Sequence, residues 1–465
     1  MRYLKIPWIL YFNVYSLYLC KKYLNMKNNM NQLLIERKIY KYRKHRPRRL
    51  RIRYGNNQRR KVCSLKFFFP FSLNNFIKHS GISPLKRNRI VIPKIFSFYS
   101  NFDESIEVFK QLLACFLRKE GNITMDFSKC ESTCLSVLSL LKILYEEFLV
   151  SQNRYQRINK LYQTRKLKII PSFKDLKVKK YLHALGFYIY DDFKDDDGEV
   201  LPLDLIRGKY RNSYQENVKA KAINQIVDFI NESFSPVNKC LTQDGLNTIE
   251  SLVSEILNNA EDHSFNNSEW FTHGISFHEQ IHEEKVVELN LAIINFGNSM
   301  YRGFEETKEL NSANYSIVNN KYSSHLKLFD EHHYFEKESL FMLYMLNEGI
   351  SRLKYQDQSR GNGTMQFLHA FATLGSFGST NRNFNSLLNV ISGHTVLSCD
   401  NQVSPYFHEN HLKLSLNKEK SLSLLPDKTY LKYNTEYFPG TIIECKIYFN
   451  EHFFDEILKN GNNEK

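Results

Sequence analysis

The segment LNTIESLVSEILNNAEDHSF, residues 246–265, has the pattern of an amphipathic helix with a polar stripe along one side. Its apolar positions share one helical face and are Ile249, Leu252, Val253, Ile256 and Leu257. Glu255, Asn259 and His263 follow at intervals of four, so their side chains line up along another face. An Asn oxygen is a hard ligand that suits Mg²⁺, and a carboxylate one turn away can activate a nucleophile that attacks a phosphate. The segment therefore indicates magnesium–nucleotide chemistry, although on its own it fits an exposed helix face equally well.

A buried strand and a glycine-rich turn follow in chain order. The segment VVELNLAIINFGNSM, residues 286–300, reads as a strand that ends in Asn295 and Gly297. A polar side chain at a strand end can accept a hydrogen bond from the adenine amino group, and glycine lets the backbone approach the ring. In SRGNGTMQFLHAFATLG, residues 359–375, glycines open directly into a helix, where backbone N–H groups and the helix dipole favour phosphates.

The last of these motifs is FPGTIIECKIYF, residues 438–449, in which Gly440 and Thr441 precede a strand. Apolar residues alternate along that strand at Ile443, Cys445, Ile447 and Phe449. The four segments together resemble the N box and the three glycine boxes of the GHKL family, which comprises gyrase-type, heat-shock-chaperone-type and histidine-kinase-type ATPases. The resemblance covers residues 245–449 and implies an α+β two-layer sandwich, a mixed sheet with helices on one face, that binds ATP and Mg²⁺.

The resemblance also implies roles for individual residues. Glu255 corresponds to the catalytic base, Asn259 to the Mg²⁺ ligand, and Gly297 to the glycine beside adenine. Asn295 departs from the family, which has Asp there, and a neutral acceptor gives roughly half the strength of a charged one. Thr441 corresponds to a residue that forms a hydrogen bond near the base. The residues implied to contact the phosphates are Gly361, Gly363 and Thr364.

Residues 298–360 separate the first two glycine boxes and are longer than a minimal ATP lid. The apolar stretch SLFMLYMLNEGISRL, residues 339–353, predicts a packed helix, whereas NSANYSIVNNKYSS, residues 311–324, predicts a mobile segment. Two interpretations stay open, namely a lid that orders over bound nucleotide and an insertion without a gating role.

The N-terminal half alternates strand-like and helical patterns between residues 64 and 190, which predicts an α/β unit. Within it MDFSKCESTCLSVLSLL, residues 125–141, weakly resembles the strand-turn-helix of STAS (sulfate-transporter and anti-sigma-antagonist) domains. Asp126 ends the strand, and Ser132 and Thr133 precede the helix, at the position where STAS domains can be phosphorylated. The turn between strand and helix is about three residues shorter here than in that family. The other interpretation is that Ser132 and Thr133 form an ordinary helix N-cap.

Charge is concentrated at the N-terminus. Residues 1–102 hold 24 Lys/Arg against the single acid Glu36, a local charge of +23, whereas the whole chain has a net charge of +15. Residues 37–61 carry 13 Lys/Arg with interleaved tyrosines and predict either a polyanion-binding or nucleic-acid-binding arm or a solvated tail. The apolar stretch of residues 6–20 is too short to cross a bilayer comfortably, so membrane attachment is not expected.

These patterns divide the chain into predicted units: a basic arm (1–63), a STAS-like α/β domain (64–200), a polar helical connector (201–244), a GHKL-type ATP-binding domain (245–450) and a polar tail (451–465). The eight cysteines show no CxxC pair, which favours reduced thiols and a cytoplasmic protein.

One motif points to a different chemistry. His278, Glu279 and His282 match the HExxH spacing of zinc proteases, which requires a helix because only there do the two histidines converge on one metal. The flanking sequences predict instead two antiparallel strands joined by a hairpin at IHEEK, residues 281–285. The context therefore argues against a protease.

The sequence leaves three functional hypotheses. The first is an ATP-binding regulatory protein that hydrolyses Mg-ATP to switch its N-terminal half or a partner. The second is an anti-sigma-type serine/threonine kinase that acts on a STAS-like domain at Ser132 or Thr133. The third is a polyanion-binding module that only senses the nucleotide. By analogy with the family, a bacterial signalling or antiviral-defence setting suits this architecture.

Overall fold

The structure is a computed structural model, and the residues it describes lie in one compact unit, Val62–Lys465. It describes residues 71–450 except 84–87, 119–120, 161–162, 171, 188–198, 210–215, 263–268, 282–283, 329–334, 348–362, 377–385, 401 and 410. The predictions for the basic arm and for the C-terminal tail fall outside these residues. Among the helices that the structure describes, none combines the length and apolar character needed to cross a membrane.

The described residues form a mixed α/β protein with several sheets, as the sequence predicts at that level. The largest sheet has five strands. In their order in the sheet the strands are β6 (Val200–Lys209), β7 (Glu269–Ile281), β8 (Glu284–Phe296), β12 (Leu431–Asn450) and β9 (Leu387–Asp400). The prediction of a mixed sheet is wrong, because every one of these described pairings is antiparallel. Strand β12 lies between β8 and β9, so these two strands, which run in the same direction, never pair.

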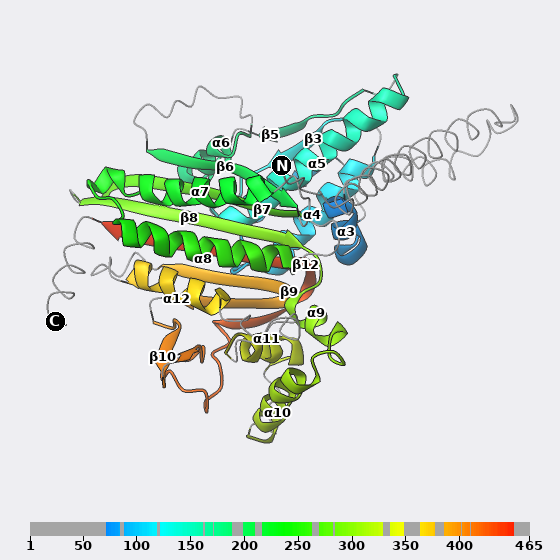
Figure 1. Ribbon diagram of the computed structural model, residues 1–465. Helices are drawn as coiled ribbons and strands as arrows, with labels where there is room; N and C mark the ends of the chain where they lie inside the picture. Colours follow the sequence, from blue (N-terminus) through cyan, green and yellow to red (C-terminus); the bar gives the residue numbers. More distant parts are fainter. Residues whose placement is uncertain are drawn as a thin grey trace, which may run out of the picture. The chain divides into compact units, whose positions relative to one another are not determined.

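Helices cover one face of the five-stranded sheet (Figure 1). They are α7 (Glu216–Glu232), α8 (Gln243–Asp262) and α12 (Gly363–Ser376). Their apolar sides share a core with odd-numbered residues of the central strands, such as Ile293 and Ile443. The predicted helix of residues 246–265 is therefore confirmed as α8, which continues to Asp262, the last of its residues that the structure describes.

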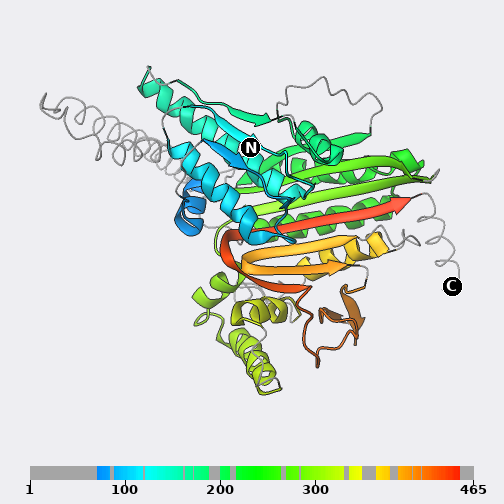
Figure 2. The same cartoon turned by 180° about the vertical axis from the view of Figure 1, so that it is seen from behind.

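The N-terminal half lies against the other face of the same sheet (Figure 2, blue and cyan). Its helices are α3 (Phe71–Ser80), α4 (Phe102–Leu117), α5 (Leu135–Ile158) and α6 (Leu176–Ala184). A parallel sheet of β1 (Arg89–Val91), β3 (Ile123–Asp126) and β5 (Leu167–Ile170) alternates with α4 and α5 along the chain. The short strand β2 (Ile95–Phe96) pairs with β4 (Ser132–Thr133).

A two-layer sandwich is therefore an incomplete description of the sheet. Its second face carries Phe271, Ile294 and Ile442 into one core with the N-terminal helices. The sequence did not predict helices on this second face, because the same face also carries Glu444. A charged residue in an alternating strand is typical of a solvent-facing position. Glu444 is in fact only 2% exposed.

The region predicted as a polar helical connector is also different. Residues 200–209 form strand β6 at the edge of the sheet, followed by α7 and the short 3₁₀ helix η1 (Ser235–Val237). Pro202 and Asp204 are unfavourable in a central strand, yet an edge strand tolerates both because one side of its backbone needs no partner. Leu203 between them is buried.

Between β8 and α12 the described residues form three helices: α9 (Met300–Glu306), α10 (Ser312–Leu328) and α11 (Lys337–Asn347). The packed helix predicted from residue 339 is confirmed as α11 up to Asn347. The stretch predicted as mobile, residues 311–324, is almost entirely within α10, because Val318 packs against Phe341 in a small core of its own. A hairpin of β10 (Tyr406–His408) and β11 (His411–Lys413) precedes β12.

Candidate functional site

Three polar residues form a row across the centre of the five-stranded sheet. Thr441 on β12 is opposite Asn295 on β8 and opposite Ser392 on β9. The side-chain oxygen of Asn295 accepts a hydrogen bond from the Thr441 N–H at 2.8 Å. The Ser392 and Thr441 hydroxyls are 3.0 Å apart. Asn295 of the first glycine box thus lies directly beside Thr441 of the third glycine box.

The amide of Asn295 explains why this position is not Asp. Its nitrogen donates a hydrogen bond to the Ala260 carbonyl at 3.1 Å, near the C-terminal end of α8. A carboxylate would meet that carbonyl with a second acceptor, and Asn295 is buried, so water could not relieve the conflict. Asn295 therefore links α8 to β12, and one lone pair of its oxygen is already used.

Gly440 makes the close approach between these strands possible. Its φ of +142° lies in a region that glycine adopts far more readily than other residues. A Cβ atom at this position would lie 2.0 Å from the backbone oxygen of Asn295. The N–H of Gly297 donates to the Pro439 carbonyl at 3.2 Å, so the first and third glycine boxes are joined on both sides of Gly440.

The N-box helix and the helix after the second box also meet at this point. Asn259 on α8 donates from its side-chain nitrogen to the Thr364 hydroxyl on α12 at 3.5 Å. A hollow of about 420 Å³, counted with its open mouth, lies between these helices and the sheet. The hollow is lined by Ile256, Asn259, Ala260, Ile293, Asn295, Met300, Thr364, Val390, Thr441 and Ile443.

The structure brings together four of the predicted site residues, namely Asn259, Asn295, Thr364 and Thr441. Glu255 lies one turn before Asn259 and is half-buried, but it is not among the residues that line the hollow. Gly361 lies outside the described residues, and Gly363 is the first residue of α12. Gly297 is buried, and its N–H is already bonded to the Pro439 carbonyl.

Ser392 is the member of the row that sequence reasoning missed. Its hydroxyl donates to the Gly440 carbonyl at 3.0 Å and accepts from the Met300 N–H at 2.8 Å. The available signal was a serine next to Gly393, directly after the apolar residues Val390 and Ile391. Gly393 has a φ of +64°, which marks the irregularity in the pairing of β9 with β12.

The predicted phospho-acceptors lie across the sheet from this hollow. Ser132 and Thr133 form strand β4, and the N-cap of α5 is Cys134, so the alternative interpretation of Ser132 and Thr133 as the N-cap is wrong. A carboxylate of the sheet occupies the helix N-terminus instead. Glu444 accepts from the Leu135 N–H at 2.9 Å and from the Ser136 hydroxyl at 2.5 Å. Burial raises the pKa of Glu444, although the bonds from Ser136 and Leu135 oppose that rise.

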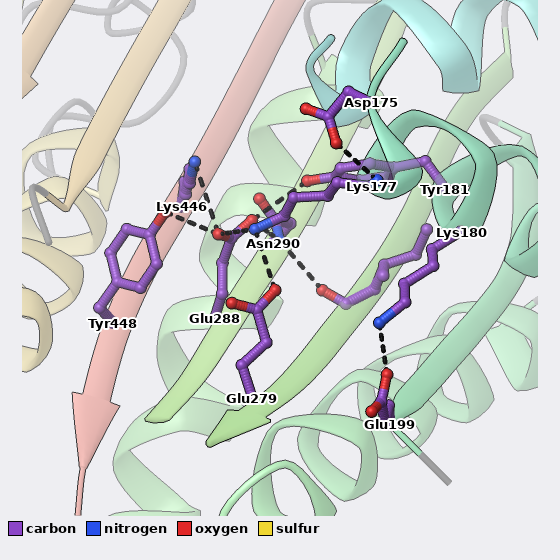
Figure 3. Close-up of polar contacts among 11 residues, drawn as sticks. Asp175, Lys177, Lys180, Tyr181, Glu199, Glu279, Glu288, Asn290, Lys446 and Tyr448 are labelled. Carbon is purple, nitrogen blue, oxygen red and sulfur yellow. Dashed lines mark hydrogen bonds and ion pairs between the residues drawn. The ribbon is translucent and has the colours of Figure 1, made fainter. Parts of the chain in front are cut away.

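A second carboxylate on this face, Glu288, joins α6 to the sheet (Figure 3). It accepts hydrogen bonds from Lys177 at 2.5 Å and Tyr448 at 2.6 Å, and Lys446 lies 3.6 Å away. Burial alone would raise its pKa, but the charges of Lys446 and Lys177 and the hydrogen bonds from Lys177 and Tyr448 outweigh it and hold the pKa at about 2. Glu288 is therefore a buried anion that holds the N-terminal half on the sheet.

The HExxH motif does not lie on a helix. Strand β7 ends at Ile281 and β8 begins at Glu284, which confirms the predicted hairpin. His278 belongs to β7, and its Nε2 is 3.2 Å from the Ser276 hydroxyl. A zinc site of this type needs both histidines on one helix, and His278 lies on a strand. His282 lies outside the described residues.

Comparison with known proteins adds no family assignment, because no protein-family model, curated protein or solved structure matches the chain. The functional argument therefore depends on the geometry of the site.

Proposed function

We propose that this chain is an ATP-binding regulatory protein of the histidine kinase-like ATPase type, which hydrolyses Mg-ATP to switch its N-terminal half or a partner. The observation that supports it most is the single hollow lined by Asn259, Asn295, Thr364 and Thr441. These residues come from segments that are scattered over the chain, and each was predicted from its own motif. The proposal includes an ATPase sandwich of the GHKL type, a STAS-like N-terminal half and a cytoplasmic location.

The residues around the hollow suit a purine nucleotide. Ile256, Ile293 and Val390 offer apolar surface for a base, while Asn295 and Thr441 supply polar groups at the sheet. The Asn295 amide is fixed in orientation by its two bonds, one to Ala260 and one to Thr441. One lone pair of its oxygen stays available for the exocyclic amino group of a purine base.

The oxygen ligands near Asn259 suit Mg²⁺ better than they would suit a softer metal ion. The Asn259 nitrogen is directed to Thr364, which leaves the amide oxygen as a hard ligand. Mg²⁺ would keep several waters and take the remaining ligands from phosphate oxygens, so one protein ligand is sufficient. Bound there, the ion would neutralise charge on the phosphates, and the Glu255 carboxylate, one turn along α8, would orient the attacking water.

Isothermal titration with ATP, ADP and GTP in the presence of Mg²⁺ tests this proposal. We expect saturable binding of ATP that weakens by about tenfold or more in Asn259→Ala. Asn258→Ala is the matched control, because the Asn258 oxygen accepts from Lys219 toward α7 rather than facing the hollow. Absence of nucleotide binding by the wild-type chain would overturn the proposal, as would equal losses in the two variants.

The kinase alternative is limited by where the acceptors lie. Ser132 is exposed, whereas the hydroxyl oxygen of Thr133 is buried. Ile443 faces the hollow and its neighbour Glu444 faces α5, so the sheet separates the acceptors from the nucleotide. Transfer to Ser132 would therefore require a second molecule. Mass spectrometry after incubation with Mg-ATP distinguishes a phosphorylated serine from release of free phosphate.

A further inference from the structure

The part of β12 just before Gly440 and Thr441 is held by the N-terminal half as well as by the sheet. The pairing of β12 with β9 shifts register between Tyr433 and Phe438 and again between Phe438 and Thr441. The pairing with β8 begins at Gly440. Residues 434–437 thus form an irregular stretch outside the regular ladders, in which Asn434 is still bonded to His394 of β9 at 3.1 and 3.2 Å.

Asp103, in the first turn of α4, binds this stretch. Its carboxylate accepts from the Glu436 N–H at 2.9 Å, from the Thr435 hydroxyl at 2.9 Å and from the Thr435 N–H at 3.4 Å. Lys110, two turns further along α4, forms an ion pair with the Glu436 side chain. Two side chains of one helix of the N-terminal half therefore bind both backbone and side-chain groups of residues 435 and 436.

Two neighbouring contacts strengthen the attachment. The Ser80 hydroxyl donates to the Tyr437 carbonyl at 3.1 Å. The next residue, Phe438, is fully buried among aromatic rings, with centroid distances of 6.0 Å to Phe98 and 6.4 Å to Phe76. Beyond the box, Glu444 caps α5 from the same strand. The N-terminal half thus contacts β12 on both sides of Gly440 and Thr441.

We propose that Asp103 is a positioning residue for the nucleotide site: by fixing residues 435 and 436 it sets where Gly440 approaches β8 and where Thr441 lies in the hollow. This inference rests on the proposed function and describes how nucleotide binding would be regulated by the packing of α4 on β12. Coupling between two sites is reciprocal, so bound nucleotide must in turn favour the seating of α4 on β12. A partner that pulls α4 away would release the nucleotide.

Asp103→Ala and Glu104→Ala provide a matched pair for the test. Both acids lie in the first turn of α4, where a negative charge interacts favourably with the helix dipole. Glu104, however, is exposed and accepts a hydrogen bond from Asn101 instead of contacting β12. We expect Asp103→Ala to weaken ATP binding by at least about fivefold in isothermal titration, the lower end of typical coupling between sites, and Glu104→Ala to leave it unchanged.

Hydrogen exchange without nucleotide gives an independent measure. The Thr441 amide should exchange faster in Asp103→Ala than in Glu104→Ala, because its bond to Asn295 depends on the placement of β12. If Asp103→Ala fails to fold, Thr435→Val removes only the hydroxyl bond at an exposed residue and should produce smaller changes in the same direction.

The outcomes separate the two proposals. A wild-type chain that binds ATP, together with an Asp103→Ala variant that has the affinity and Thr441 exchange of Glu104→Ala, overturns the positioning role and leaves the proposed function intact. A lower melting temperature with unchanged affinity and exchange also overturns it, because that is a purely structural effect. A wild-type chain that binds no nucleotide overturns both.

Discussion

Asn295 and Thr441 face each other across the β8–β12 ladder, and the side-chain oxygen of Asn295 accepts the Thr441 N–H at 2.8 Å. The other end of the same amide donates to the Ala260 carbonyl at 3.1 Å. One buried side chain therefore connects the helix that carries Asn259 with the strand that carries Thr441. A residue that only accepts hydrogen bonds cannot make both connections.

Asn295→Asp should consequently destabilise the protein at neutral pH. The carboxylate would leave the Ala260 carbonyl without its donor, at an expected loss of about 1–3 kcal/mol in the free energy of unfolding. The loss should shrink on acidification, because a protonated carboxyl group can donate in place of the amide. Urea unfolding at several pH values measures both effects.

The matched control for this charge change is Asn247→Asp. Asn247 is exposed on α8, the helix that carries Ala260, and its side-chain oxygen accepts from Gln243, a role that a carboxylate keeps. We expect its unfolding free energy to stay close to that of the wild type. Equal stability of the two variants at pH 7 would show that the Ala260 bond contributes nothing.

Gly440→Ala should be far more damaging than a substitution at another glycine with positive φ. The methyl group would lie 2.0 Å from the Asn295 backbone oxygen, so the strands must separate. We expect a loss of about 3 kcal/mol or more, within the range of steric and backbone-strain mutations. Thermal or urea unfolding measures the loss directly.

Gly81→Ala isolates the backbone component of that loss. Gly81 has a φ of +78°, and no atom lies within 4 Å of where its Cβ would be. Only the positive-φ penalty, about 1–2 kcal/mol, should apply there. Similar losses in the two variants would mean that β12 moves freely enough to accept the methyl group.

Part of this architecture could be predicted from the sequence because it depends on local periodicity. The apolar positions of α8, the alternation of Ile443 and Cys445, and the hairpin after His278 all follow from the spacing of side chains along a single element. Three of the four motif residues that line the hollow, Asn259, Asn295 and Thr364, could be placed because each stands near the end of such an element. Thr441, predicted to precede a strand, lies instead within β12 because that strand begins at Leu431.

The remainder depends on contacts between distant segments. Glu444 and Glu288 alternate with apolar residues and so resemble solvent-facing positions, although α5 and α6 cover them. Ser392 enters the site only because β9 pairs with β12. Asp103 contacts Thr435, which is far away along the chain. Periodicity within one element carries no information about such pairs.

Because of Glu288, the free energy of unfolding should depend on pH in the acid range. Its pKa in the folded state is about 2, below the ordinary value of 4.5, so its contribution is complete above pH 4.5 and is lost as the pH falls toward 2. The difference corresponds to about 3 kcal/mol. Glu288→Gln should remove this share of the acid dependence, although the variant itself will be less stable at pH 7 because Lys177 loses its buried partner.

The control for Glu288 is its neighbour Glu279→Gln. Glu279 is paired with the same Lys177 at 3.6 Å, but its side chain is 41% exposed, so its contribution should be small. Unfolding free energies from pH 2 to pH 7 compare the variants. If Glu288→Gln keeps the wild-type slope between pH 2 and pH 4.5, the carboxylate is not the anion that the lysines stabilise.

Glu255 and Asn259 should separate chemistry from binding, although they are only one turn apart. Asn259 lines the hollow and Glu255 does not, so Glu255→Gln should bind Mg-ATP with nearly the wild-type affinity. Loss of a general base typically slows a reaction by about 10²–10⁴-fold, so phosphate release should fall to that extent.

Glu250→Gln, at an exposed position on the same helix, is the matched control and should keep both properties. Titration and phosphate release, measured on the same preparations, decide the matter. Wild-type turnover in Glu255→Gln would exclude this carboxylate as the base, and a loss of binding equal to that of Asn259→Ala would place it in the binding site instead.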